Sequence, residues 1–219
     1  MATPEFQFTD GTTLPVGTMY CIGRNYAAHA REMGADVPTA PLVFIKPPTA
    51  YVPDGGSIVI PSYSSNLHHE VELVVIIGAD AENVNTVDAL FYVAGYAVGI
   101  DATLRDVQAE AKKKGEPWSV AKSFRTSAPV SVCVPAREVA TDEPLELCLS
   151  VNGELRQHGF TSHMERSVAE LVAYCSSVFG LQRGDCIFTG TPEGVSQVHK
   201  GDTLHAELVG KTSLTVSIA

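Results

Sequence analysis

The sequence predicts a mainly β, α+β fold built from short strands and a few short helices. Turn residues recur at short intervals through most of the 219 residues, which leaves few segments long enough to be helices. Short apolar runs bounded by Gly, Pro, Asn or Asp are typical of strands. Strands and helices do not alternate with equal weight, which argues against a doubly wound sheet or a barrel of βα units.

The strand pattern recurs along the whole chain. It predicts strands over residues 19–22, 42–46, 57–60, 70–77, 92–100, 130–134, 146–151, 186–189, 203–208 and 213–218. After residues 146–151, Asn152 and Gly153 supply the two positive φ angles of a type I′ turn, so a hairpin is expected there.

Three segments carry a helical pattern. In residues 167–179, apolar side chains recur on one face before Gly180 ends the helix. A second helix is predicted over residues 102–114, closed by Gly115, and a short third over residues 26–33.

Length and composition favour one domain of ordinary size. We expect this domain to cover residues 19–219, with residues 1–18 as an N-terminal extension that packs on it. The five cysteines never approach C-x-x-C spacing, which favours a reducing compartment. No segment resembles a signal peptide, and none approaches the ~18 consecutive apolar residues of a membrane span. We therefore expect a cytoplasmic protein.

The charge balance limits the kinds of molecule that the chain is expected to bind. Fifteen Lys and Arg residues against 25 Asp and Glu residues give a formal net charge of −10. Such a chain lacks the positive field that holds nucleic acid or an anionic membrane surface, so neither is expected as a partner.

Two glutamates open an otherwise apolar strand. Period-2 alternation places Glu70 and Glu72 on one face, about 6 to 7 Å apart. A second apolar strand ends at Asp101, where it could complete a set of three carboxylates. Burying like charges is costly unless a cation neutralises them, and oxygen ligands suit Mg²⁺ or Mn²⁺. The alternatives are an exposed strand end for the glutamates and a helix N-cap for Asp101.

Asp101 also begins a polar stripe. Arg105, Gln108 and Lys112 follow it at steps of 4, 3 and 4, which places all four on one helical face. Arg105 and Gln108 can bind a substrate carboxylate, although such a stripe is often only a solvated face. The run Lys112-Lys113-Lys114 is interpreted as a solvated helix end that meets the helix dipole favourably.

The adjacent His68 and His69 raise the alternative of a zinc site. They lack H-E-x-x-H spacing and have no cysteine at ligand spacing, so at least one is expected to be a packing or hydrogen-bonding residue beside the site.

These residues and their neighbours resemble the fumarylacetoacetate hydrolase family from about Cys21 to the C-terminus. The blocks that carry the resemblance are Ile22-Gly23-Arg24-Asn25-Tyr26 with His29 and Glu32, Phe44-Ile45-Lys46-Pro47, His68-His69-Glu70-Val71-Glu72, Asp101-Ala102-Thr103-Leu104-Arg105-Asp106-Val107-Gln108, Trp118 with Ala121-Lys122-Ser123-Phe124, Val151-Asn152-Gly153-Glu154-Leu155-Arg156-Gln157, and Thr189-Gly190-Thr191-Pro192-Glu193-Gly194-Val195. The chain is most similar to the small acylpyruvase and oxaloacetate decarboxylase branch, and almost as similar to bacterial hydroxymuconate isomerases.

The resemblance implies a mixed β-sandwich roll, usually a homodimer, with Mg²⁺ or Mn²⁺ held at positions matching Glu70, Glu72 and Asp101. It also implies a catalytic lysine at Lys122. The implied contacts to the substrate are at Arg24, Arg105, Gln108 and the backbone of Thr191.

The resemblance further implies cleavage of 3-acylpyruvates or decarboxylation of oxaloacetate through a metal-stabilised pyruvate enolate. His29 and Glu32, three residues apart on a helix, are the expected base and its orienting partner for the attacking water. The alternatives are a helix-surface pair for these two residues, a hydroxymuconate isomerase or decarboxylase, and a catalytically silent dicarboxylate-binding dimer.

Two segments depart from the family pattern. Arg125 stands where many relatives have aspartate, and Ser196-Gln197 follows Val195 where Gly-Pro is common. The first could alter the charge near Lys122, and the second the loop after Thr191.

Overall fold

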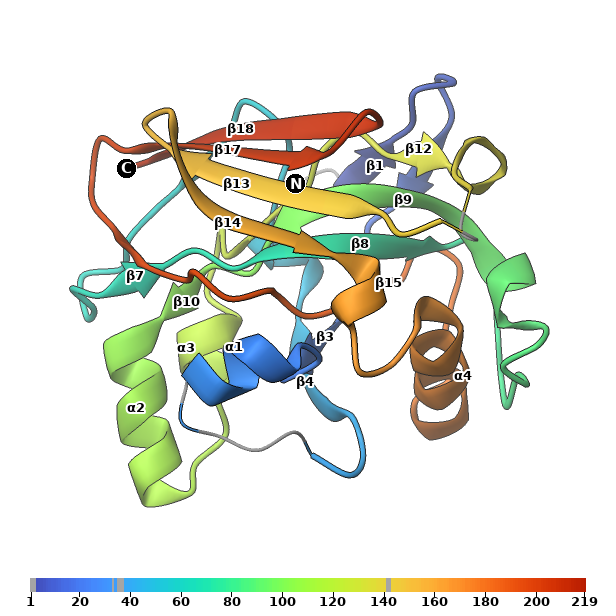
Figure 1. The fold of residues 1–219 in the computed structure, drawn as a ribbon, viewed down its shortest axis with the longest axis horizontal. Helices are drawn as coiled ribbons and strands as arrows, with labels where there is room; N and C mark the ends of the chain where they lie inside the picture. The colour runs from blue at the N-terminus through green and yellow to red at the C-terminus, as the bar shows by residue number, and fades with distance from the viewer. Residues whose placement is uncertain (1–2, 33, 35–37, 141–142) are drawn as a thin grey trace.

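The described fold consists of two large mixed sheets packed face to face, with the α-helices below the strands in the view of Figure 1. The computed structural model describes residues 3–32, 34, 38–140 and 143–219. The mainly β, α+β prediction is confirmed.

The first sheet is six-stranded, in the order β12-β9-β8-β15-β3-β4. Its strands are β3 (Met19–Gly23), β4 (Leu42–Lys46), β8 (Val71–Ile77), β9 (Val93–Ile100), β12 (Val134–Pro135) and β15 (Cys186–Phe188). Strand β8 pairs antiparallel with β9, and β15 pairs parallel with β3. This sheet carries Glu72 on β8 and Lys46 on β4, and Glu70 and Asp101 lie just beyond the ends of β8 and β9.

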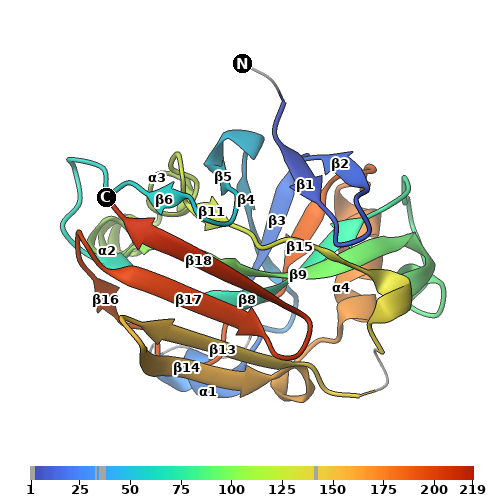
Figure 2. The same ribbon diagram turned by 90° about the horizontal axis from the view of Figure 1, so that it is seen from above.

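The second sheet is five-stranded, in the order β14-β13-β17-β18-β6. It contains β6 (Ser57–Ile58), β13 (Glu146–Val151), β14 (Glu154–Phe160), β17 (Thr203–Leu208) and β18 (Thr212–Ile218). The predicted hairpin joins β13 to β14, with φ of 52° at Asn152 and 82° at Gly153. Figure 2 shows β13, β14, β17 and β18 as one layer in front of β8 and β9.

Three smaller sheets complete the β structure of the described residues. They are β1 (Glu5–Gln7) with β2 (Thr13–Pro15), β5 (Tyr51–Val52) with β11 (Ala128–Pro129), and β7 (Leu67–His68) between β10 (Thr103–Leu104) and β16 (Gln197–Val198). The β1–β2 hairpin buries Phe6 and Leu14 against the first sheet. The division at residue 18 stays a prediction.

The helices lie in two groups (Figure 1). Helices α1 (Ala27–Glu32), α2 (Arg105–Lys114) and α3 (Ser119–Lys122) lie on one side, and α4 (Val168–Val178) lies apart from them. Four 3₁₀ turns are also described, η1 (Pro48–Ala50), η2 (Ala89–Tyr92), η3 (Ala136–Glu138) and η4 (Thr161–His163). Within the described ranges, no helix is long and apolar enough to cross a membrane.

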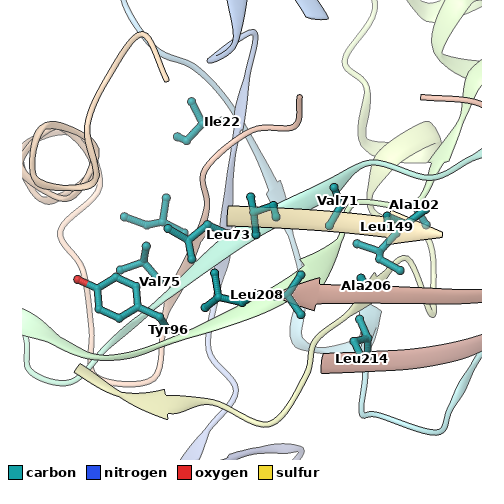
Figure 3. Close-up of a cluster of buried hydrophobic side chains, with 14 of the residues drawn as sticks. Ile22, Val71, Leu73, Val75, Tyr96, Ala102, Leu149, Ala206, Leu208 and Leu214 are labelled. Atoms are coloured by element: carbon teal, nitrogen blue, oxygen red, sulfur yellow. The ribbon is translucent and has the colours of Figure 1, made fainter. Parts of the chain in front are cut away.

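Strand β8 separates two apolar clusters. Val71, Leu73 and Val75 belong to the larger cluster between the two sheets, which Figure 3 shows with Leu149, Ala206, Leu208 and Leu214 of the second sheet. Val74 and Ile76 point the other way, into the cluster beneath the N-terminal hairpin. Because side chains alternate along a strand, Glu72 opens the face that Val74 and Ile76 continue.

Several boundaries differ from the prediction. The helix expected over residues 102–114 begins at Arg105, because Thr103 and Leu104 pair with β7 as a short strand. The strand expected over residues 130–134 shortens to Val134–Pro135. The predicted helix over residues 26–33 spans Ala27–Glu32, and residue 33 lies outside the described residues.

Candidate active site

The three predicted carboxylates meet where β8 begins and β9 ends. Val71 pairs with Ile100 in the antiparallel register, so Glu70 and Asp101 lie opposite each other just beyond the two strands. The backbone N–H of Asp101 donates to the carbonyl of Glu70 at 2.8 Å. Glu72 lies one alternation further on, and oxygen atoms of all three residues lie within 4.8 Å of one another.

All three carboxylates are buried, at 5 %, 2 % and 0 % exposure for Glu70, Glu72 and Asp101. The exposed strand end is therefore excluded as an explanation of the glutamates. Asp101 is not the cap of α2 either, since the N-cap position is Leu104.

Lys122 lies between two of these carboxylates. Its Nζ donates to Glu70 Oε2 at 2.7 Å, to Asp101 Oδ2 at 2.5 Å and to Thr103 Oγ1 at 2.6 Å. Burial by itself would lower the pKa of Lys122, but Asp101 and Glu70 outweigh it and raise the pKa. The residue comes from α3, a helical turn that the sequence pattern did not predict, and its ammonium lies 4.9 Å from the centroid of the Phe44 ring.

Glu70 and Glu72 differ in their cation partners. Glu70 contacts Lys122 and also Arg105, whose Nη2 lies 2.5 Å from Glu70 Oε1. Burial opposes ionisation of Glu70, but Lys122 and Arg105 hold its pKa well below the usual range. Glu72 makes no ion pair within the described part of the chain, and it accepts from the N–H of Gly190 at 2.6 Å. Burial, followed by Asp101 and Glu70, raises its pKa well above the usual range.

This arrangement fits a divalent cation. The donor set is three carboxylates, which is the hard oxygen set that Mg²⁺ and Mn²⁺ prefer. A cation among them would stabilise the ionised form of Glu72, the one carboxylate of the three for which no cationic contact is described. The ligand assignment stays a prediction.

Two lysines on different elements make the buried network possible. Lys46, at the end of β4, is fully buried, and its Nζ lies 2.8 Å from Asp101 Oδ1. It also donates to Ser127 O at 3.0 Å, to Ser127 Oγ at 2.9 Å and to the carbonyl of Lys122. Lys46 was part of the family resemblance, but the sequence assigned it no role. The available signal was a lysine inside an apolar strand and next to a proline.

Gln157 is a second residue without a predicted role. Its Oε1 accepts from the N–H of Val71 at 3.0 Å and contacts His69 Nδ1 at 2.8 Å. Its Nε2 donates to Thr191 Oγ1 and to the carbonyl of Pro192, both at 2.8 Å. Gln157 therefore fixes the loop that carries Thr191 to the start of β8.

The histidine pair has the predicted structural character. Buried His69 contacts Gln157 and the hydroxyl of Ser196, the latter at 2.8 Å from Nε2. Burial lowers the pKa of His68 to about 4. The groups of metal-ligand type found among the described residues contain neither histidine. Of the two departures from the family pattern, Ser196 contacts His69, whereas Arg125 is exposed.

His29 and Glu32 form the expected pair on α1. His29 Nδ1 lies 3.1 Å from Glu32 Oε2, and His29 is 8 % exposed. Glu32 also accepts from the N–H of Gly194 at 3.2 Å, which ties α1 to the loop after Thr191. His29 faces the pocket that holds the carboxylates, so the pair is more than a surface contact. Its catalytic role stays a prediction.

One pocket gathers the predicted substrate contacts. Arg24, Arg105, Gln108 and Thr191 line it together with His29, Lys122 and the three carboxylates. Arg105 Nη1 donates to Gln108 Oε1 at 2.8 Å, so the two side chains on α2 hold each other in place. Lys112 and Trp118 also line this pocket. Lys112 is exposed at the end of α2, as the interpretation of a solvated helix end expects, and its place on the Arg105–Gln108 face also brings it to the pocket.

Comparison with known proteins defines the family. The model of the fumarylacetoacetate hydrolase C-terminal domain matches residues 18–219. The chain belongs to the fumarylacetoacetate hydrolase family. In this family it is 48 % identical over 198 residues to the Bos taurus protein named oxaloacetate tautomerase FAHD1, mitochondrial, with 90 % of each chain covered. It is 45 % identical over 202 residues to oxaloacetate tautomerase YcgM of Escherichia coli, with 92 % of each covered.

A solved structure of the family matches the whole fold. The fumarylpyruvate hydrolase of Pseudomonas aeruginosa, in complex with Mn²⁺ and pyruvate, superposes with a TM-score of 0.95 at 40 % identity. The match covers all of this chain and 97 % of that one. The chain is thus an enzyme of the fumarylacetoacetate hydrolase family, and the predicted family and fold are confirmed.

Proposed function

We propose that the chain is an Mg²⁺- or Mn²⁺-dependent enzyme that hydrolyses the C–C bond of 3-acylpyruvates through a pyruvate enolate. The observation that carries the proposal is the convergence of two sets of groups on one pocket. Three buried carboxylates with Lys122 form one set, and His29 with Glu32 forms the other. The first set suits stabilisation of an enolate, and the second suits activation of water.

Each group has a distinct task. Glu70, Glu72 and Asp101 would hold the cation, which when bound supplies Lewis acidity toward the oxygens of the keto acid. The ammonium of Lys122 stabilises the negative charge that develops on the enolate oxygen. Arg105 and Gln108, held together by their hydrogen bond, orient the substrate carboxylate.

Hydrolysis further requires an activated water. His29 takes a proton from that water, which attacks the carbonyl carbon distal to the carboxylate. Glu32 orients the imidazole through its contact with Nδ1. The C–C bond between that carbonyl and the methylene then breaks, its electron pair enters the pyruvate enolate, and protonation of the enolate carbon gives pyruvate and a carboxylic acid.

A second candidate function is tautomerisation of oxaloacetate. The relatives at 48 % and 45 % identity carry that activity in their names. Moving a proton at the carbon next to the ketone requires the same enolate stabilisation but no attacking water. Decarboxylation of oxaloacetate has the same requirement.

The variant His29→Ala separates these functions. With Mg²⁺ or Mn²⁺ and acetylpyruvate, we expect the wild type to consume the enol absorbance and to release acetate and pyruvate. In His29→Ala, hydrolysis should fall by about 10² or more, the usual contribution of a general base. Binding of Mn²⁺, followed by calorimetry, should persist because His29 is not among the three ligands. Unchanged hydrolysis would remove the base from the mechanism, and activity that survives complete chelation would remove the metal.

We also propose that the enzyme is a cytoplasmic homodimer. The family resemblance supports the dimer, and five cysteines that all remain free in the structure support a reducing compartment. Light scattering of the purified protein tests the assembly, and a monomer at micromolar concentration would contradict it.

A further inference from the structure

Lys112 lies at the rim of the active-site pocket. It lines the pocket beside Arg24, Arg105 and Trp118. Its Nζ lies 5.1 Å from the centroid of the Trp118 ring, a favourable cation–π distance. Among the ion pairs of the described residues, none includes Lys112.

The surroundings of Lys112 are positively charged. Partial desolvation lowers its pKa first, and Arg105, Arg24 and Lys122 lower it further. Arg105 and Lys122 each contact Glu70 deeper in the pocket. Glu70 acts on Lys112 in the opposite sense, but no ion pair of the described residues joins them, so an anion bound at the rim would relieve repulsion among these cations.

The geometry of α2 sets the distance between Arg105 and Lys112 along the pocket. Arg105, Gln108 and Lys112 are separated by three and four residues and share one face of the helix. At about 1.5 Å per residue, Lys112 lies about 10 Å along the axis from Arg105. A keto acid held by Arg105 and Gln108 would therefore reach Lys112 only through a second acidic group several carbons away.

We propose that Lys112, placed over Trp118, forms a subsite for the distal carboxylate of keto diacids and thereby determines specificity for them. The subsite rests on the proposed function, in which the keto acid end of the substrate lies at the carboxylate trio. It defines the substrate class as 2-keto acids whose second carboxylate lies several carbons from the keto group.

The test compares two keto acids of equal length. Neither contains a β-dicarbonyl bond that the enzyme could cleave, so binding can be measured without turnover. These are 2-oxoadipate, which has a distal carboxylate, and 2-oxohexanoate, which has none. Both are titrated, with Mn²⁺ in excess, into the wild type, Lys112→Met and Lys113→Met. Lys113 is the matched control because it is an exposed neighbour on the same helix end and is absent from the pocket lining. Trp118 is the single tryptophan, so its fluorescence reports occupancy of the subsite directly.

We expect the wild type to bind 2-oxoadipate more tightly than 2-oxohexanoate. Lys112→Met should weaken 2-oxoadipate binding about tenfold, the typical contribution of one charge-assisted contact. It should leave 2-oxohexanoate within about twofold, and Lys113→Met should change neither. Lys112→Arg should restore the preference for the diacid.

Three outcomes would overturn the subsite. An equal loss for both acids in Lys112→Met would show a general effect on the pocket. An equal loss of 2-oxoadipate binding in Lys113→Met would show that only the overall positive charge of the helix end matters. An unchanged ratio of the two affinities in Lys112→Met would show that Lys112 does not contact the distal carboxylate. Failure of the proposed function gives a different result, because wild-type enzyme that binds both acids but hydrolyses no acylpyruvate would refute the reaction while the binding ratio still decides the subsite.

Discussion

Replacing Lys46 by methionine tests whether the buried network holds the site together. The ammonium is fully buried and contacts Asp101 Oδ1 at 2.8 Å, in addition to the oxygens of Ser127. Removing one partner of a buried ion pair costs about 3–5 kcal/mol, because the remaining charge stays buried. Asp101 keeps its contact with Lys122, so we expect the lower end, about 3 kcal/mol. For a chain of this size that corresponds to a Tm lower by about 6–12 °C.

The assay is urea unfolding followed by circular dichroism, in buffer with a chelator so that metal binding does not contribute to stability. Lys200→Met is the control, since Lys200 is exposed, and its stability should change by less than about 0.5 kcal/mol. An unchanged m-value would confirm that the native state is the same. A loss below about 1 kcal/mol in Lys46→Met would refute the reasoning, because Lys122 alone would then suffice to balance Asp101.

Two further predictions concern backbone geometry. Gly190→Ala should weaken Mn²⁺ binding, measured by calorimetry, about tenfold or more. The φ angle of Gly190 is 98°, and a Cβ there would lie 2.9 Å from another side chain. The substitution would therefore displace the backbone N–H that Glu72 accepts from. Gly201→Ala, at φ 94° with open space around it, should leave Mn²⁺ binding unchanged, and equal losses would contradict the reasoning. Ser167→Ala should cost about 1 kcal/mol in urea unfolding, since Ser167 and Glu170 form a capping box on α4. The hydrogen bonds from Ser167 lower the pKa of Glu170. The stability that this capping box contributes is therefore fully present above the unfolded pKa of Glu170, about 4.5, and is lost as pH falls through the lower pKa of the folded protein. A loss of stability in Ser167→Ala that does not shrink below pH 4 would contradict the assignment.

Strand positions were predictable where one face of the sheet is buried. Residues 146–151 and 203–208 have the predicted bounds, because alternation and flanking turn residues coincide there. Residues 42–46 also have the predicted bounds, although their side chains do not alternate in burial. The predicted start of α2 was wrong by three residues. Thr103 and Leu104 satisfy their backbone groups by pairing with β7, a contact distant in sequence that no local pattern encodes.

The carboxylate trio was predictable from spacing because its members belong to two neighbouring strands. The sequence could not assign Lys46, since its role depends on Asp101, which follows β9, and on Ser127 of a later loop. Gln157 presents the same difficulty, because its four contacts join segments that are far apart in the chain. Residues that act through long-range hydrogen bonds leave little local signal.

The chain has a net charge of −10, but the site is not negative, and this difference is consistent with the expected anionic substrate. Two of the three buried carboxylates, Glu70 and Asp101, pair with the cations Lys46, Lys122 and Arg105, and the network balances only when Glu72 is ionised as well. A divalent cation held by the carboxylates would favour the ionised form of Glu72 and leave this network positive by about two charges. Because repulsion between like charges is strong at low dielectric, that excess favours binding of an anionic keto acid. The acidic surface therefore carries no information on the substrate, whereas the balance of the buried charges does.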